Sequence, residues 1–156
     1  MSPYLFALIS SIVFYSVAIQ MPKRMTRLEI YCTSLSSVLI NVLIDVYLDM
    51  HMHLYNYFDP GIDYVALIYN FAIFPPISTI FLNYFPFSRH VWSKVKYLAG
   101  WTCFALGYEF LSTRTGVLTY SGWHLWYSAF VYPAAQILQA LNLAVIRKWC
   151  EKIPIH

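Results

Sequence analysis

Long apolar windows alternate with short polar connections along the whole chain. Each window is long enough for a helix to cross a hydrocarbon core of about 30 Å, which takes roughly 20 residues. The connections are too short to fold separately, so we expect one integral membrane domain over residues 1–156. The expected fold class is all-α, a polytopic bundle of about five transmembrane helices. The predicted spans are 3–21, 28–49, 64–84, 97–113 and 125–146.

The composition favours a multi-pass protein of the cell membrane, with membrane lipid as its surroundings. Of the residues, 60% are apolar and only 11% are charged, whereas soluble domains carry about a quarter charged residues. The basic residues behind the net charge of +3 lie at the ends of apolar windows. Nucleic acid needs an open basic face, so we do not expect it as a partner. Cys32, Cys103 and Cys150 are scattered and resemble neither a disulfide framework nor a zinc site.

The charged residues are distributed unevenly between the two sides of the predicted bundle. Nine of the ten basic residues lie in the connections after the first and third spans or in the tail, and Arg114 is the exception. Positively charged connections stay in the cytoplasm, which places the N-terminus outside and the C-terminus inside. The nine residues are Lys23, Arg24, Arg27, Arg89, Lys94, Lys96, Arg147, Lys148 and Lys152.

The acidic stretch NVLIDVYLDMHMH places Asn41, Asp45, Asp49 and His53 at four-residue spacing near the outer side. Four residues advance about 400° in a helix, so these side chains share one stripe. Asp45, Asp49 and His53 could therefore bind a divalent cation such as Mg²⁺, Mn²⁺ or Zn²⁺, or a diphosphate headgroup bridged by one. The alternative is that Asp49 and His53 are wetted interfacial residues and that Asp45 joins a hydrogen-bond network between helices.

Asp45 and Glu109 are the candidate catalytic residues. Asp45 lies about a turn below the interface, where an ionised carboxylate costs several kcal/mol unless it faces protein or water. We therefore expect it to face inward. Glu109 lies near the outer end of the fourth span and can give or take a proton in an acid–base reaction. A structural pair with Arg114 is the alternative role for Glu109.

Aromatic residues gather near the same outer side. Amphipathic rings are favoured at a membrane interface, so many of them are expected to form an aromatic belt. Those that follow or adjoin Glu109 can instead bound a substrate pocket and stabilise a cation. The candidate substrate-binding residues are Tyr108, Tyr120, Trp123, His124 and Trp126.

Two connections on the outer side can cover such a site. The loop 55–64 contains an Asp-Pro-Gly turn, and the segment 115–123 alternates polar with apolar residues and contains two glycines. The second segment is expected to be turn-rich or re-entrant, either a lid or an ordinary surface loop. Asp59 is expected to make an Asx-type turn, and Asp63 to cap the third span. The adjacent prolines at 75–76 are expected to kink or break that span.

Three stretches carry a resemblance to a known group of proteins. They are YFDPGIDYVALIYNFAIFPPISTIFLNYFPF, YEFLSTRTGVLTYSGWHLWYSAFVYP and AVIRKW. Over roughly residues 50–150, the chain resembles a family of small uncharacterised multi-pass membrane proteins of Gram-positive spore-formers. This resemblance implies a membrane topology and no activity. The matching positions are Asp59, Pro60, Gly61, Asp63, Pro75, Pro76, Glu109, Gly116, Tyr120, Gly122 and Trp123.

A fainter similarity is to the membrane-embedded lycopene cyclases and terpene cyclases. An acidic helix, a Thr-Gly turn with aromatic residues and a further helix occur in the same order. The similarity implies that an intramembrane carboxylic acid protonates an olefin or an epoxide. The residues that carry it are Glu109, Thr115, Gly116, Tyr120 and Trp123.

Two classes of function follow from these features. In the first, the protein is an enzyme that acts on a lipid or isoprenoid within the bilayer, with Glu109 or Asp45 transferring a proton. In the second, it is a membrane subunit or small carrier, linked to the envelope or spores. Such a protein would pack against a membrane-protein partner or a second copy, or pass a cation or proton. An aromatic-lined cavity around the carboxyl groups favours the enzyme, and an exposed polar face favours the partner.

Overall fold

Helices make up most of the structure, a computed structural model that describes residues 2–58 and 64–150. The helices are α1 (Pro3–Gln20), α2 (Arg27–Asp45), α3 (Tyr64–Asn83), α4 (Val91–Thr115) and α5 (Leu125–Cys150). A π-helical turn, η1 (Val46–His51), extends α2, and two short strands, β1 (Tyr55–Tyr57) and β2 (Leu118–Tyr120), complete the described elements. The all-α fold class is confirmed, with a small strand pair added to it.

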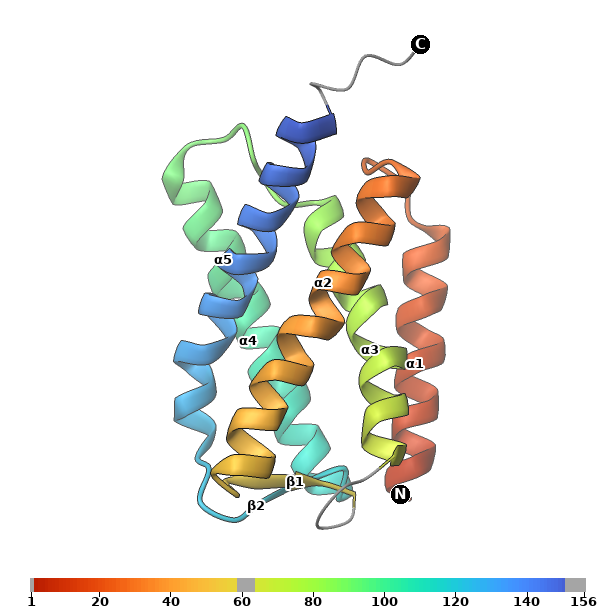
Figure 1. The fold of residues 1–156 in the computed structure, drawn as a ribbon, viewed down its shortest axis with the longest axis vertical. Coiled ribbons are helices and arrows are strands. Elements are labelled where there is room, and N and C mark those ends of the chain that lie inside the picture. The colour runs from red at the N-terminus through yellow and green to blue at the C-terminus, as the bar shows by residue number, and fades with distance from the viewer. Residues whose placement is uncertain (1, 59–63, 151–156) are drawn as a thin grey trace.

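The helices run alternately in opposite directions and lie side by side (Figure 1). Four of them, α1, α2, α3 and α5, are long and apolar enough to cross a membrane, and for α2 this segment extends through Asp49. Each predicted span coincides with one helix, and the largest difference is at α4, which begins at Val91 rather than at 97. α4 has 25 residues and carries Lys94, Lys96, Glu109 and Arg114, which makes it the most charged of the helices.

Apolar side chains cover the outside of the bundle, and polar side chains fill much of its inside. Large exposed apolar residues include Leu8, Ile19, Leu39, Ile68 and Phe130. Buried polar residues include Thr33, Ser37, Asn70, Ser78 and Glu109. This distribution is the reverse of the one in soluble domains, where polar residues are mostly exposed. It fits helices whose outer faces meet hydrocarbon and whose small polar residues pack between helices.

The most buried helix is α3, which contacts α1, α2 and α5. In α3, 44% of the apolar window is buried, against 11% to 17% in the other three apolar helices. α3 continues through Pro75 and Pro76, so the prolines do not break it. Two prolines remove two N–H donors, while the hydrogen bonds of the flanking turns and the packing on both sides remain.

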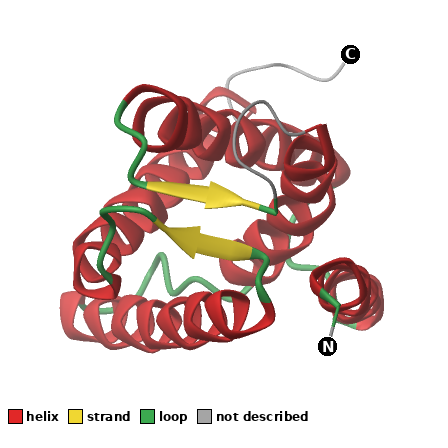
Figure 2. Cartoon of the chain, turned by 90° about the horizontal axis from the view of Figure 1, so that it is seen from below, coloured by secondary structure: helices red, strands yellow, loops and turns green. Residues whose placement is uncertain are grey.

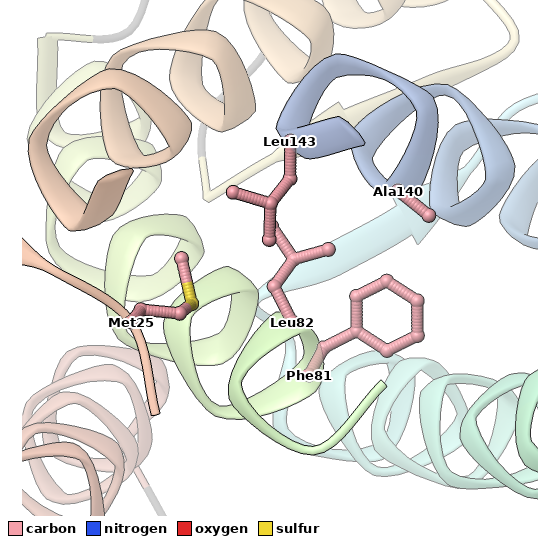
Figure 3. Close-up of a cluster of buried hydrophobic side chains, with 5 residues drawn as sticks. All are labelled: Met25, Phe81, Leu82, Ala140 and Leu143. Carbon is pink, nitrogen blue, oxygen red and sulfur yellow. The ribbon is translucent and has the colours of Figure 1, made fainter. Parts of the chain in front are cut away.

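A cluster of buried apolar side chains joins the helices at one end of the bundle (Figure 3). Leu82 of α3 and Leu143 of α5 are almost fully buried, at 1% and 0% exposure. Partly buried rings of α4, among them Tyr97 and Trp101, pack against the same cluster. The cluster therefore fixes α3, α4, α5 and the connection after α1 relative to one another. Its members are Met25, Phe81, Leu82, Ala140 and Leu143.

The two strands pair in antiparallel fashion across the opposite end of the bundle (Figure 2). Tyr55 lies opposite Tyr120, and Tyr57 lies opposite Leu118. Gly116, with φ of 80°, ends α4 and turns the chain into β2. The segment expected to be turn-rich thus contains a strand, and its partner comes from the loop expected to cover the same site. The expected roles of Asp59 and Asp63 fall outside the described residues.

The bundle has two chemically different ends. The basic end consists of the connections 21–26 and 84–90, the starts of α2 and α4, and the C-terminal part of α5. The acidic end consists of η1, the strands and the connection 121–124. The basic residues predicted to lie on one side gather at the basic end, except Lys152, which is outside the described residues. Asp45, Asp49 and Glu109 lie toward the acidic end, together with Arg114.

A buried carboxylate, Glu29, holds the start of α2 at the basic end. Thr26 and Glu29 form a capping box, in which each side chain accepts the other residue's backbone N–H. The second carboxylate oxygen of Glu29 accepts Nε of Arg147 at 2.8 Å. This ion pair connects α2 to α5. Glu29 therefore acts in helix capping and in packing between helices.

We expect Glu29→Ala to lower the free energy of unfolding by about 3 kcal/mol. The change leaves the Arg147 guanidinium without its carboxylate and removes half of the capping box. Thermal unfolding in detergent, followed by circular dichroism, measures the difference. Thr26→Ala is the matched control, because it removes one capping bond and should cost about 1 kcal/mol. Equal stability of the two variants would show that the ion pair contributes nothing.

Candidate functional site

A cavity of about 180 Å³ lies between α2, α3, α4 and α5 and reaches the strand pair. Both candidate catalytic residues, Asp45 of α2 and Glu109 of α4, line it. The wall is rich in aromatic rings, which come from three helices, α3, α4 and α5, from β1 and from the connection after β2. They include Tyr57, Tyr69, Phe104, Tyr108, Trp123 and Tyr132. The expectation that Asp45 faces inward agrees with this position.

Among the described residues, the carboxylate of Asp45 is held by neutral donors alone. One oxygen accepts the Tyr55 hydroxyl at 2.6 Å and, more weakly, the Tyr57 hydroxyl at 3.5 Å. The other oxygen accepts Nδ2 of Asn70 at 2.7 Å. The donors come from β1 and α3, so the chain after the π-helical turn folds back to bind the carboxylate near the end of its own helix.

The phenols of β1 stay protonated and can act as donors at any physiological pH. Burial raises the pKa of the Tyr55 hydroxyl, and the charge of Asp45 raises it further. Burial also raises the pKa of Tyr57 well above its ordinary value, with Asp45 as the next cause. Both phenols therefore present an O–H, rather than a phenolate, to the Asp45 carboxylate.

The carboxylate of Glu109 is buried and is held by three hydroxyl groups. One oxygen accepts Tyr120 at 2.6 Å and Ser128 at 2.8 Å, and the other accepts Tyr132 at 2.6 Å. Trp123 helps to position one of these donors, because its Nε1 donates to Ser128 Oγ at 2.8 Å. Burial raises the pKa of Tyr120, and its hydrogen bond to Glu109 raises it further, so Tyr120 remains a donor.

The alternative pairing of Glu109 with Arg114 is wrong. The Arg114 guanidinium lies over the ring of Phe110, 5.1 Å from its centroid. The only ion pair among the described residues joins Arg147 to Glu29. Five positions along α4 separate Glu109 from Arg114, and a helix turns about 100° per residue, so their side chains point to different sides.

The described residues do not assemble the predicted metal site. Among residues 2–58 and 64–150, no three His, Cys, Asp or Glu side chains are grouped to hold a metal ion. The four-residue stripe ends because η1 replaces α-helical geometry after Asp45 and because His53 has a positive φ of 53°. Asp49 has no side-chain hydrogen bond to the described part of the chain, and His53 is exposed.

Two of the predicted substrate-binding residues line the cavity, and the other three do not. Tyr108 and Trp123 line it, and the Tyr108 hydroxyl lies 2.7 Å from that of Tyr69. Tyr120 does not line the cavity, but its hydroxyl donates a hydrogen bond to Glu109, which does. His124 and Trp126 are exposed at the acidic end, where both rings contact Tyr127.

Several residues of the site were not singled out by the sequence. Tyr55 and Tyr57 look like belt aromatics, because nothing local distinguishes a phenol at an interface from one that binds a buried carboxylate. Asn70 and Ser128 carried a usable signal, because each is a polar residue within or at the edge of an apolar window. Tyr132 carried none, since its role depends on the rotation of α5 about its axis.

The cavity wall contains a buried polar group without a partner. Ser78 lines the cavity, and its Oγ is buried and makes no hydrogen bond to the described residues. Buried polar groups normally find partners. Ser78 therefore marks a place where a polar ligand group or a water molecule can bind.

Comparison with known proteins gives no relative for this chain. No family model, no curated protein and no solved structure matches it. The site itself consists of two carboxyl groups, each held by neutral donors, on the wall of one aromatic cavity.

We expect Glu109→Ala to destabilise the protein more than Glu109→Gln does. Alanine leaves the hydroxyls of Tyr120, Ser128 and Tyr132 without an acceptor, at about 1–3 kcal/mol for each. Glutamine keeps the volume and one acceptor oxygen, so its cost should be about 1 kcal/mol.

Thermal unfolding in detergent compares the two variants. Asp49→Ala serves as the control, because this half-buried carboxylate lies at the same end and has no side-chain hydrogen bond to the described residues. It should unfold close to the wild-type temperature. Equal melting temperatures for Glu109→Ala and Glu109→Gln would contradict the role of Glu109 as the shared acceptor.

Proposed function

We propose that this is a multi-pass enzyme of the cell membrane that carries out acid–base chemistry on an unsaturated isoprenoid or related lipid. The observation that carries the proposal is that Asp45 and Glu109 line one aromatic cavity and that neither forms an ion pair with any described residue. A carboxyl group without a cation can take up or release a proton without breaking an ion pair. Two such groups on one wall can supply both the acid and the base of a reaction.

The proposed topology has five spans, with the N-terminus outside and the C-terminus cytoplasmic. Four helices meet the length and hydropathy of a span. α4 is the fifth, because it lies among them and runs the full length of the bundle (Figure 1). The basic end faces the cytoplasm by the positive-inside rule. The cavity then opens toward the outer half of the bilayer, near the acidic end.

The proposed reaction begins with proton transfer from Asp45 to a carbon–carbon double bond. The π electrons of the double bond form the new C–H bond, and the adjacent carbon becomes a carbocation. Glu109 then removes a proton from a neighbouring carbon, and the electrons of that C–H bond form a new double bond. We assign Glu109 as the base because three short hydrogen bonds, of 2.6, 2.8 and 2.6 Å, stabilise its carboxylate, whereas Asp45 has two short bonds and a weak third one at 3.5 Å.

The aromatic wall suits the charge that develops in this reaction. A cation is attracted to the face of an aromatic ring, most strongly to Trp and next to Tyr and Phe. Trp101, Phe104, Tyr108 and Trp123 lie on the same cavity wall as the carboxyl groups. These rings would stabilise the carbocation until Glu109 removes a proton.

The size of the cavity limits the part of the substrate that it can hold. Its volume is about 180 Å³, and an engineered apolar cavity of about 150 Å³ binds benzene. The cavity thus has room for one isoprene-sized unit and not for a whole lipid chain. The rest of the substrate would extend between the helices into the bilayer.

The unpartnered hydroxyl of Ser78 favours a substrate with an oxygen function. A hydroxyl or carbonyl near the reacting double bond would give Ser78 the hydrogen bond that it lacks. An oxygenated isoprenoid therefore fits the cavity better than a pure hydrocarbon does.

The first test follows hydrogen exchange into a lipid. The protein is placed in nanodiscs that contain farnesol or geranylgeraniol and is incubated in deuterated water. We expect mass spectrometry of the recovered lipid to show deuterium bound to carbon or a shifted double bond. Asp45→Asn and Glu109→Gln should each lower the rate by about 100-fold or more, because each removes one partner of the proton transfer.

Asp49→Asn is the control for this test, because it removes a carboxylate at the same end from outside the cavity lining. Its rate should change far less than that of Asp45→Asn or Glu109→Gln, because Asp49 acts on Asp45 only through its charge. Wild-type protein that adds no deuterium to either alcohol, or an Asp45→Asn variant as active as wild type, would contradict the proposed chemistry.

A second candidate function is the passage of protons. It is favoured by a polar stripe that runs along α2 from Glu29 to Asp45. Asp45 is the last of five polar residues at four-residue spacing on α2, and most of them are buried. Asn41 donates to the Ser37 carbonyl, and Thr33 donates to the Glu29 carbonyl. Such a stripe can relay a proton between the two ends, although small polar residues also serve in helix packing. The stripe is Glu29, Thr33, Ser37, Asn41 and Asp45.

Proton passage predicts that liposomes containing the protein acidify inside when the outside pH is lowered. Pyranine trapped in the liposomes measures the change. Asn41→Leu should slow it at least about tenfold, because it interrupts the stripe next to Asp45. Ser34→Ala, on another face of α2, is the control and should not differ from wild type. Wild-type liposomes no leakier than empty ones would exclude this candidate.

A further inference from the structure

A second cavity, of about 620 Å³, lies at the basic end of the bundle. It is formed by the connection 84–90, the C-terminal part of α3, the start of α4, and single residues of α5 and of the connection 21–26. The carboxyl groups of the first site are at the opposite end. A ligand bound in this second cavity would therefore be independent of the acid–base chemistry proposed above.

Three guanidinium groups line this second cavity, and none of the lining residues within the described ranges 2–58 and 64–150 carries a carboxylate. Arg24, Arg89 and Arg147 come from three separate parts of the chain. Glu29 accepts only Nε of Arg147, at 2.8 Å, so the two terminal nitrogens of Arg147 have no partner among the described residues. Ser88 and Ser93 add hydroxyl donors to the same wall. The cavity is thus rich in donors and carries a net positive charge.

Two of the guanidinium groups are positioned by contacts that leave their donors available. Arg24 lies 5.1 Å from the centroid of the Tyr84 ring, and Arg147 lies 4.8 Å from that of Phe87. A guanidinium stacked on a ring keeps its N–H groups in its own plane, where they can bind a ligand. The buried side chain of Asn83 also fixes the connection after α1, because it accepts the N–H of Arg24 at 2.7 Å and donates to the Pro22 carbonyl at 3.0 Å.

We propose that this cavity binds a phosphate group. Arginine forks match the oxygens of a phosphate in pairs, and charge-assisted hydrogen bonds of this kind are the strong ones. Under the proposed orientation, the cavity lies at the cytoplasmic surface of the membrane. Basic pockets between helices on that side bind the head groups of anionic lipids. The phosphate can belong to such a lipid or to a soluble phosphate compound.

The experiment compares three probes bound to the whole protein in detergent, by native mass spectrometry. They are dioctanoyl phosphatidic acid, dioctanoylglycerol, which has the same chains without the phosphate, and sodium phosphate. We expect phosphatidic acid to bind saturably and dioctanoylglycerol to bind at least about tenfold more weakly. Competition by millimolar sodium phosphate would identify a soluble phosphate as the source, and its absence would identify the lipid.

The double variant Arg24→Gln/Arg89→Gln tests the cavity itself. Both side chains are exposed and form no ion pair, so the protein should still fold, and the affinity for phosphatidic acid should fall roughly tenfold or more. Lys96→Gln/Lys148→Gln is the matched control, because it removes two positive charges near the same end from outside the cavity lining. Its affinity should stay within about twofold of wild type.

The outcomes separate a built site from general surface charge. Equal loss in the two double variants, or equal binding of phosphatidic acid and dioctanoylglycerol, would overturn the proposal. Asp45→Asn should bind phosphatidic acid as wild type does. Failure of the deuterium exchange test with retained phosphate binding would thus remove the proposed enzyme and leave this site.

Discussion

Polar groups inside a bundle that faces lipid must find their partners within the protein, because the surrounding hydrocarbon offers none. This constraint explains why polar side chains of this chain are buried while leucine, isoleucine and phenylalanine are exposed. It also explains the strand pair. β1 and β2 satisfy each other's backbone groups at the acidic end, and they bring the phenols of Tyr55, Tyr57 and Tyr120 to two carboxylates on different helices.

The same constraint links the fold to the site. A hydrogen-bonded carboxyl group inside the bundle holds several elements together, and it also brings acid–base chemistry into a space that water reaches poorly. Glu109 joins α4 to β2 and α5 through its three hydroxyl partners. Asp45 joins α2 to β1 and α3. Stability and the proposed chemistry therefore depend on the same side chains. Glutamine and asparagine variants keep part of the hydrogen bonding while they remove the acidic group, so they distinguish a loss of chemistry from a loss of stability better than alanine variants do.

The sequence was sufficient for the helices and for the two central carboxyl groups, because both depend on local patterns. Apolar windows determine a span, and an acidic residue inside a window must face protein. The partners of those groups depend on how the helices rotate and pack: Asn70 lies 25 residues from Asp45, and Tyr132 lies 23 residues from Glu109. The three predicted metal ligands are not grouped among the described residues for a related reason. The metal prediction assumed an unbroken α-helix through His53, whereas a π-helical turn ends the four-residue spacing after Asp45.

The chain contains an internal comparison that bears on function. Glu29 is also a buried carboxylate, and it is neutralised by Arg147 and used in a capping box. If Asp45 and Glu109 served only to connect helices, a cation beside each would balance the charge in the same way. Instead, each has phenol, hydroxyl or amide donors, which hold a carboxylate in place without supplying a positive charge. A carboxylate neutralised by arginine is poorly suited to exchange a proton, whereas one held by neutral donors can do so and keep its position.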